Sequence, residues 1–547
     1  MLVRRARATG EDLAWAASAV AGGLATQRAA ERELAREGLD KELIGREAFV
    51  ARVAASADLA RYELAGLAEA LGLDLDARAA VDAGEAAAQT ARTAFVRLFD
   101  AGLVHRAERV VGACPGCATT IGASEAVAAH LGGDGLLLRL ALTDESDGGH
   151  LDVGCLAAEL LPGVVAVAVP DGSPAAGGAA LIPVAATVVP VVANAGVGTP
   201  TLVVPAHDQR SFDLAWRLGI APVPVLDGRG FVCAPGPLAG LARYAARAAA
   251  RKLLDAEGVV VGIAEGLEPI ERCPACTTVL VPLLGTQWVL TVADLETSAA
   301  DAVRDGRLAV WPPAAREDLV AGAGSAGEWC LSQQVWGGVP VPVGRCVECG
   351  TLDVSVDPAT SCRRCMGDLV ADDDVLDARF VRCMLPLATA GWPEARGAGD
   401  RPGGGVVFVV PQVAAGDILP MVALALRLDG TVPFDEVAVL CPVREAAEEE
   451  PVADVPALAA QEGPQVLRLA LLCGGLDLAE ARGLLGRIEA TPLGEADVEQ
   501  LAAAMEDAFA ALAPSVALGL LAAAVRQGVP AADGPRVREL AAPFVGR

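Results

Sequence analysis

Four Cys-x-x-Cys pairs constrain the fold of this chain more than any other feature of its sequence. They account for eight of its 14 cysteines. Each pair can form a short knuckle that offers two thiolates, and two knuckles together supply the four ligands of a tetrahedral zinc site. The first residues of the chain contain no apolar signal segment. The pairs therefore indicate metal ligands in a reducing compartment, the cytoplasm, rather than disulfides.

The last two pairs are neighbours in the sequence. Twelve residues separate Cys346 and Cys349 from Cys362 and Cys365, and a glycine follows the first pair. This spacing predicts a structural zinc ribbon. The alternatives are reduced cysteines in tight turns, or a site that has lost its metal.

The first two pairs are far apart in the sequence. Between Cys114 and Cys117 and the second pair, Cys273 and Cys276, lie 155 residues. Together they predict one zinc that closes the base of an inserted domain and holds its two ends together. A redox role is the rival, although no thioredoxin-like sequence surrounds either pair. The remaining cysteines are predicted to be buried packing residues: Cys155, Cys233, Cys330, Cys383, Cys441 and Cys473.

The chain is long enough for several α/β domains. With 547 residues it is longer than a domain with one hydrophobic core usually is. Hydrophobic residues make up 53% of the chain and charged residues 21%, which is typical of a globular protein. Residues 28–70 have helical periodicity, whereas short runs rich in β-branched residues fill about 135–235. The uncharged stretch 179–205 could span a bilayer by length, but its four prolines predict buried strands and no membrane segment. The net charge of −27 disfavours non-specific nucleic-acid binding, although a local basic stripe could still bind RNA.

Several segments, taken in order, resemble one enzyme family. They are ATQRAAERELAREGL, FVRLFDAGLVHRAERVVGACPGC, VVPAHDQRSFDLAWRLGI, ERCPACTTVLVPLLGTQWVL and EWCLSQQVWGGVPVP. This ordered set resembles the valyl-tRNA synthetases of class I. The resemblance implies an α/β fold: a Rossmann-type catalytic domain split by a β-rich editing insertion, with zinc knuckles and a helical carboxyl-terminal segment. The family attaches valine to tRNA with ATP and Mg²⁺, and its insertion hydrolyses mischarged threonine.

The resemblance also divides the chain into segments. They are residues 1–130, the first part of the Rossmann-like core; 131–270, the editing-like insertion; 271–375, a return segment with the zinc ribbon; 376–476, the second part of the core; and 477–547, a helical stem or shortened start of an anticodon-binding domain.

The chain departs from the family at both ATP-binding motifs. The His-x-Gly-His loop has no counterpart among the four histidines, and the matched region begins just after its expected place. The Lys-Met-Ser-Lys-Ser loop needs mobile ammonium groups near the triphosphate. At its expected place the chain reads AAEEEPVADVP, and Lys41 and Lys252 are its only lysines. We expect ATP and Mg²⁺ to bind only if the family activity is retained.

The amino-acid pocket is also altered. Val20 stands where the family has the carboxylate that holds the substrate ammonium. Arg379 replaces the tryptophan of Asp-Thr-Trp-Phe, between the retained Asp377 and Phe380. In the motif around Trp329, Gln333 replaces an arginine. These changes disfavour valine binding.

The insertion gives a mixed signal. Ala206-His207-Asp208 matches the family loop whose aspartate binds the substrate amino group, but the facing threonine-rich motif aligns with residues 155–159 and keeps only Glu159. His207 and Asp208 are therefore candidates for a remnant of the editing site. The alternative, which we favour, is a solvated turn that has kept its shape.

The sequence thus predicts a valyl-tRNA synthetase-like protein that lacks aminoacylation and acts as a binding or regulatory paralogue, a pseudoenzyme. Two alternatives are a freestanding hydrolase of misacylated tRNA and a functional valine–tRNA ligase read from a wrong start codon. Whether the chain is an enzyme stays open at this point. Zinc is the expected cofactor, and tRNA or a protein is the expected partner.

Overall fold

The computed structural model describes residues 23–440, apart from 71–76, 123–124, 132–134, 144–148, 265–267, 312, 325–326, 358, 394–406 and 412–415. Several predictions lie outside these residues. They concern Val20, the acidic run 446–456, Cys441, Cys473 and the helical segment 477–547.

Helices form the first part of the described chain, as the periodicity of residues 28–70 predicts. They are α2 (Gly23–Arg36), α3 (Lys41–Ile44), α4 (Arg46–Ala70) and α5 (Ala77–Asp100). The break between α2 and α3 has local causes, because Gly38 has a φ of 76° and the Asp40 side chain accepts a hydrogen bond from the N–H of Leu43. Helix α5 ends before Gly102, whose φ of 73° turns the chain into the next strand.

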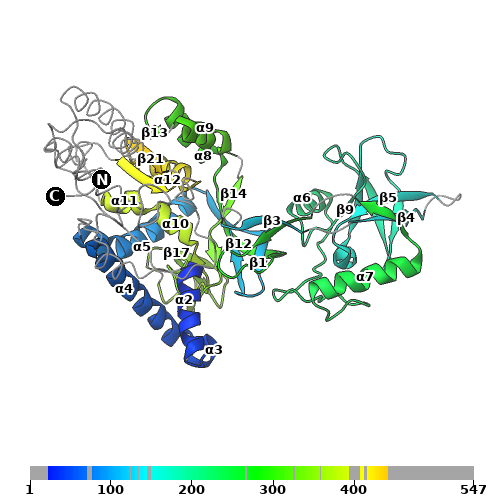
Figure 1. Ribbon diagram of the computed structural model, residues 1–547, viewed down its shortest axis with the longest axis horizontal. Coiled ribbons are helices and arrows are strands. Elements are labelled where there is room, and N and C mark those ends of the chain that lie inside the picture. Colours follow the sequence, from blue (N-terminus) through cyan, green and yellow to red (C-terminus); the bar gives the residue numbers. More distant parts are fainter. Residues whose placement is uncertain are drawn as a thin grey trace, which may run out of the picture.

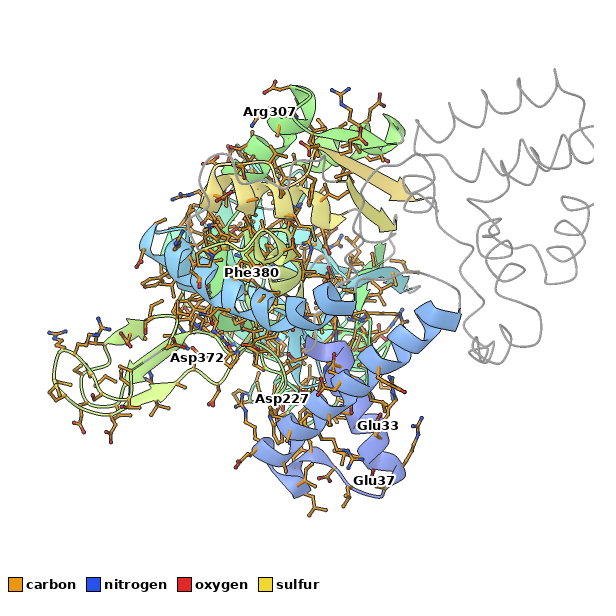
Figure 2. All side chains as sticks on the ribbon, turned by 90° about the vertical axis from the view of Figure 1, so that its left-hand side faces the viewer. Glu33, Glu37, Asp227, Arg307, Asp372 and Phe380 are labelled. Carbon is orange, nitrogen blue, oxygen red and sulfur yellow. The ribbon has the colours of Figure 1, made fainter. Side chains whose placement is uncertain are left out.

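A small parallel sheet and the helices around it form the main core. The strand order is β13–β21–β20, and parallel neighbours require crossover connections, which here are helical. The elements are β13 (Ala309–Trp311), β20 (Val407–Pro411), β21 (Glu436–Leu440), α8 (Ala293–Arg304), α9 (Pro313–Gly322), α10 (Ala378–Cys383), α11 (Leu385–Thr389) and α12 (Ile418–Asp429). Figure 2 shows Phe380 in the middle of this part, and its side chain is fully buried.

Two long strands lead out of the core and back. Strands β1 (Val104–Cys114) and β12 (Val281–Thr291) pair antiparallel, from Val104 opposite Leu290 to Ala113 opposite Val281. Trp288 on β12 is buried against Phe95 of α5, with ring centroids 5.4 Å apart. Short strands extend this connection, which we call the seam: β2 (Thr119–Ile121), β3 (Val127–Leu131), β11 (Glu268–Arg272) and β14 (Glu328–Cys330).

Residues 135–264 form a separate lobe beyond the seam (Figure 1). Its seven-stranded sheet has the order β10–β4–β5–β9–β6–β8–β7 and a hydrophobic core of its own. Its elements are β4 (Gly135–Ala141), β5 (His150–Cys155), η1 (Ala158–Gly163), β6 (Ala166–Val169), β7 (Ala179–Ile182), β8 (Thr187–Ala193), β9 (Thr201–Val203), α6 (Gln209–Leu218), α7 (Arg243–Glu257) and β10 (Val260–Ala264). The uncharged stretch 179–205 therefore forms strands, and none of the helices in the part of the chain described is long and apolar enough to cross a membrane.

A three-stranded ribbon projects from the core. It contains β16 (Val343–Cys346), β17 (Leu352–Val354) and β18 (Leu369–Ala371), in the order β17–β16–β18. Asp372 lies at its base (Figure 2) and accepts a hydrogen bond from Trp288 Nε1 at 3.0 Å. Strands β15 (Ser332–Gln333) and β19 (Val375–Leu376) pair beside it. The ribbon is thus anchored on the same tryptophan that packs the seam onto α5.

Candidate metal centres and synthetase-type site

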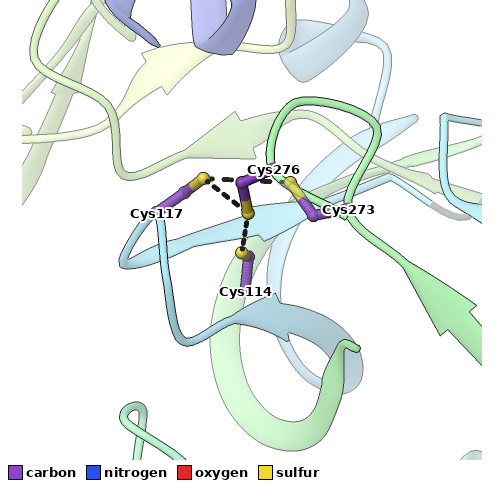
Figure 3. Close-up of side chains that lie close together, drawn as sticks. All are labelled: Cys114, Cys117, Cys273 and Cys276. Carbon is purple, nitrogen blue, oxygen red and sulfur yellow. Dashed lines mark hydrogen bonds between the residues drawn. The ribbon is translucent and has the colours of Figure 1, made fainter. Parts of the chain in front are cut away.

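The first cysteine tetrad lies at the junction of the seam and the lobe. The Sγ atoms of Cys114, Cys117, Cys273 and Cys276 all lie within 4.8 Å of one another (Figure 3). The Cys114–Cys276 and Cys117–Cys276 sulfur distances are both 3.4 Å, and that of Cys117–Cys273 is 3.8 Å. Three of the four residues are buried, and apolar side chains of α2 and the seam surround them.

The second tetrad lies at the tip of the ribbon. The Sγ atoms of Cys346, Cys349, Cys362 and Cys365 also lie within 4.8 Å of one another, and the Cys346–Cys365 distance is 3.4 Å. Cys349 and Cys365 are exposed, so this tetrad is more accessible than the first.

All four knuckles share one backbone conformation. The residue after each second cysteine has a positive φ: Ala118 (53°), Thr277 (59°), Gly350 (70°) and Met366 (62°). Three of these four residues are not glycine, although a left-handed conformation is costly for residues with a Cβ. The turn directs both thiols of a pair toward one point, which is the arrangement that metal binding requires.

The geometry of both tetrads fits zinc. A tetrahedral Zn²⁺ with Zn–S bonds of about 2.3 Å separates its sulfur ligands by about 3.8 Å, close to the 3.4–3.8 Å between the thiols here. Zinc binds thiolates rather than thiols. Hydrogen bonding from Cys117 lowers the pKa of Cys114 to about 5, and the same contact raises the pKa of Cys117. In the second tetrad, hydrogen bonding from Thr351 lowers the pKa of Cys349 to about 6, while contacts with Cys346 and Cys349 raise the pKa of Cys365. The support for zinc is therefore the geometry of the four sulfurs. Both tetrads could therefore hold zinc.

Buried polar groups occupy the part of the core where the family's amino-acid pocket is expected. Gln333 on β15 donates from Nε2 to Asp377 Oδ2 at 2.8 Å and to Glu125 Oε2 at 3.3 Å. Asp377 is buried and caps α10 by accepting the N–H of Phe380. Burial raises the pKa of Asp377 to about 7, and it also raises the pKa of Glu125.

Arg379 covers the ring of Trp329 in this part of the core. Its guanidinium lies 5.1 Å from the centroid of the Trp329 ring and pairs with Asp417 at 2.6 Å. Asp417 also accepts from Arg382 at 2.9 Å. A cation held by an aspartate therefore covers one face of the Trp329 ring. The sequence singled out Arg379 and Gln333, but not Glu125 or Asp417.

His207 and Asp208 have structural roles in the lobe. His207 is buried; its Nε2 accepts the backbone N–H of Val225 at 2.9 Å, and its Nδ1 donates to the carbonyl oxygen of Pro282 at 2.7 Å. Asp208 is exposed and caps α6 by accepting the N–H of Ser211 at 2.7 Å. The loop therefore docks the lobe onto β12, and the two side chains face different surroundings.

Glu159 lies in a buried ion network that the sequence did not reveal. Its carboxylate accepts from Arg243 Nε at 3.1 Å and from Arg247 Nε and Nη2 at 2.6 Å each. Arg243 also donates to the carbonyl oxygen of Leu280 in the seam. The retained glutamate thus joins η1 to α7 and, through Arg243, to the seam.

One prediction about the unpaired cysteines is wrong. Cys233 is exposed, whereas its neighbours Val232 and Ala234 are buried in the lobe. The chain is extended here, so alternate side chains point in opposite directions and Cys233 points outward. Cys155 and Cys383 are buried as predicted, and Cys330 is half-buried.

Comparison with known proteins identifies the family. The family model described as tRNA synthetases class I (I, L, M and V) matches residues 1–449. The chain belongs to this family. The predicted fold class, a class I synthetase α/β fold, is thereby confirmed.

The relatives of this class I synthetase-like chain are valine–tRNA ligases. The chain is 31% identical over 406 residues to that of Desulfotalea psychrophila, covering 72% of this chain and 46% of the relative. It is 33% identical over 404 residues to the valine–tRNA ligase of Streptomyces coelicolor, which covers 72% of this chain and 45% of the relative. It is 30% identical over 464 residues to that of Geobacter sulfurreducens, which covers 82% of this chain and 52% of the relative. The chain therefore spans about half the length of these relatives, and it is valine–tRNA ligase-like in sequence.

Proposed function

We propose that this valine–tRNA ligase-like chain does not activate valine and instead serves as a binding or regulatory module. The observation that carries the proposal is its lysine content. The sequence has only Lys41 and Lys252. The Lys41 ammonium bonds to Glu31 at 3.0 Å and lies 5.3 Å from the Trp336 ring centroid, while Lys252 lies on α7 of the lobe. Neither lysine can act as a mobile ammonium beside a triphosphate in the core.

The altered pocket supports the same proposal. Valine needs an apolar pocket, but Arg379 places a charged group over Trp329 and is held there by Asp417. Vacating this position would break a half-buried ion pair, which is costly when the partner remains behind. Valine would therefore bind only at the expense of this pair.

We also propose that both tetrads hold structural zinc and that residues 131–270 are an editing-like insertion of a cytoplasmic protein. In the second proposal, the lobe 135–264 corresponds to that insertion. Metal analysis of the full chain should give about two zinc ions per chain. Replacing Cys114 and Cys346 with serine, one at a time, should remove one zinc each; a chain with no zinc would contradict this proposal.

The test of the main proposal is ATP–pyrophosphate exchange with valine. The purified full chain should give no exchange above that of a blank without valine, with an active valine–tRNA ligase measured alongside. Clear valine-dependent exchange would refute the proposal. A filter-binding screen with tRNA then asks whether tRNA is a partner, and a pull-down with the intact chain asks whether a protein is.

Hydrolysis of misacylated tRNA is the second candidate, since the sequence of the 206–208 loop matches the editing motif. The capping role of Asp208 and the burial of His207 weigh against it. A deacylation assay on threonyl-tRNA(Val) decides the matter. Hydrolysis that Asp208→Ala abolishes and Asp213→Ala on the same helix leaves intact would favour the hydrolase.

A further inference from the structure

The cysteines of the second tetrad, at the tip of the ribbon, differ in their exposure to solvent. Cys349 and Cys365 are exposed, whereas Cys346 and Cys362 are buried. In the first tetrad three cysteines are buried and Cys276 is half-buried. Thiols are oxidised in the order of their accessibility to the oxidant. An oxidant in solution can therefore reach two sulfurs of the second tetrad together, but at most one sulfur of the first.

The two exposed thiols are also neighbours. The Sγ atoms of Cys349 and Cys365 lie 3.4 Å apart. The contacts that Cys365 makes with Cys346, at 3.4 Å, and Cys349 with Cys362, at 3.7 Å, each include a buried partner. A redox-sensitive thiol is accessible and has a second thiol beside it that completes the reaction. The exposed pair meets both conditions, and its two members come from different knuckles.

We propose that Cys349 and Cys365 are a site of reversible oxidation by hydrogen peroxide, and that their disulfide releases the metal of the second tetrad. One thiolate first attacks an oxygen of the peroxide, which breaks the O–O bond and gives a sulfenic acid and hydroxide. The other thiolate then attacks the sulfenic sulfur, which forms the S–S bond and expels a second hydroxide. The peroxide gains two electrons and the two sulfurs lose them, so the reaction needs no further co-reactant.

Oxidation of this pair would remove two of the four metal ligands while the ribbon stays closed. Zinc binds thiolates, so two remaining thiolates, those of Cys346 and Cys362, would hold it weakly. The backbone of both knuckles has bonds of its own, because Cys346 donates its N–H to the carbonyl oxygen of Thr351 at 2.9 Å and Cys362 donates to that of Gly367 at 2.8 Å. A disulfide between the knuckles would add a covalent link to these bonds. Restoring the thiols would then restore a site that has kept its shape.

The test is a time course of the full chain in hydrogen peroxide, with two measurements on each sample. Isotope-coded alkylation and mass spectrometry report the remaining thiol at each cysteine and map the disulfides, and a chromogenic chelator reports released zinc. We expect Cys349 and Cys365 to lose their thiols together, at least about tenfold faster than the cysteines of the first tetrad. Their disulfide should be the dominant one, and dithiothreitol should reverse it. Equal rates in the two tetrads, or a dominant disulfide within one knuckle, would overturn the proposal.

Three variants assign the released zinc to its tetrad. Cys114→Ser leaves the second tetrad intact and should release its zinc rapidly in peroxide, whereas Cys346→Ser leaves the first tetrad intact and should release its zinc slowly. Cys233→Ser removes an exposed cysteine that belongs to neither tetrad and should leave both rates unchanged. Equal release from the first two variants would overturn the proposal.

The release of metal rests on the proposed zinc sites, but the disulfide does not. A chain purified without zinc would refute those sites, and the thiol time course would still decide whether Cys349 and Cys365 are the oxidation site. Valine-dependent pyrophosphate exchange, which would refute the proposed lack of activation, leaves both measurements as they stand.

Discussion

The buried network around Glu159 allows a quantitative prediction about the lobe. Glu159 is fully buried on η1 and accepts three charge-assisted hydrogen bonds from Arg243 and Arg247 of α7. Glu159→Gln keeps the size of the side chain but removes its charge. One of the two carboxylate oxygens becomes an NH₂ group that faces guanidinium N–H donors. Both arginines then lose their counter-charge, and Arg243 is itself buried.

The expected cost follows from the number and burial of these bonds. A hydrogen bond to a charged group contributes about 1.5–3 kcal/mol, and removing one partner of a buried ion pair costs about 3–5 kcal/mol. Because glutamine retains one acceptor oxygen, we expect Glu159→Gln to destabilise α7 by about 3 kcal/mol, the lower end of that range.

Hydrogen exchange measured by mass spectrometry is the appropriate assay, because a chain with several domains does not unfold in one step. Amides of α7 should exchange about a hundredfold faster in Glu159→Gln, and those of α12 in the core should not change. Asp152→Asn, which removes an exposed pair with Arg139 in the same lobe, is the matched control and should leave α7 unchanged. Less than a threefold change in α7 (about 0.6 kcal/mol) would refute the reasoning.

Three further outcomes are expected. Asp377→Asn should flatten the pH dependence of the stability of α10. The raised pKa of Asp377, about 7, favours the folded state below the unfolded value of about 3.9, and this contribution is lost as pH rises through 7. Protection factors of α10 amides that change equally between pH 5 and 8 in variant and parent would contradict this. His207→Ala should speed exchange around Val225, and the parent lobe should lose stability as pH falls below about 6.5, because burial lowers the pKa of His207. Protection factors in the parent lobe that do not fall with pH, after correction for the intrinsic exchange rate, would contradict this. If zinc fills the first tetrad, Arg28→Leu should speed the transfer of that zinc to a chelator. The Arg28 guanidinium interacts electrostatically with Cys117 and Cys276, and its buried Nε has no hydrogen-bond partner. Zinc release from the second tetrad, and from an Arg32→Leu variant, are the controls.

Local features of the fold could be predicted from the sequence, because their signal lies within a few residues. The knuckles are an example: two cysteines three positions apart need a tight turn, and the structure supplies it at Ala118 and Met366. The strands of 179–205 are another, since prolines and β-branched residues exclude a long helix.

The polar clusters could not be predicted in the same way. The chain has 70 acidic residues, so nothing marked Glu125 or Asp417 before the fold placed them beside Gln333 and Arg379. These contacts join residues more than 30 positions apart, and loop carboxylates have no periodicity. Cys233 was predicted as buried from its residue type, whereas its position in an extended segment decides its exposure.

The pairing of β1 with β12 has a consequence for how such a chain can change over time. The polypeptide leaves the core at Val104 and returns at Leu290, directly opposite. The lobe 135–264 lies beyond this ladder, and a short connection could replace the lobe while Phe95 and Trp288 stay packed against each other. Insertions and deletions in the lobe are therefore shielded from the core by geometry. A protein built in this way can lose, exchange or repurpose its outer part while the inner part continues to fold.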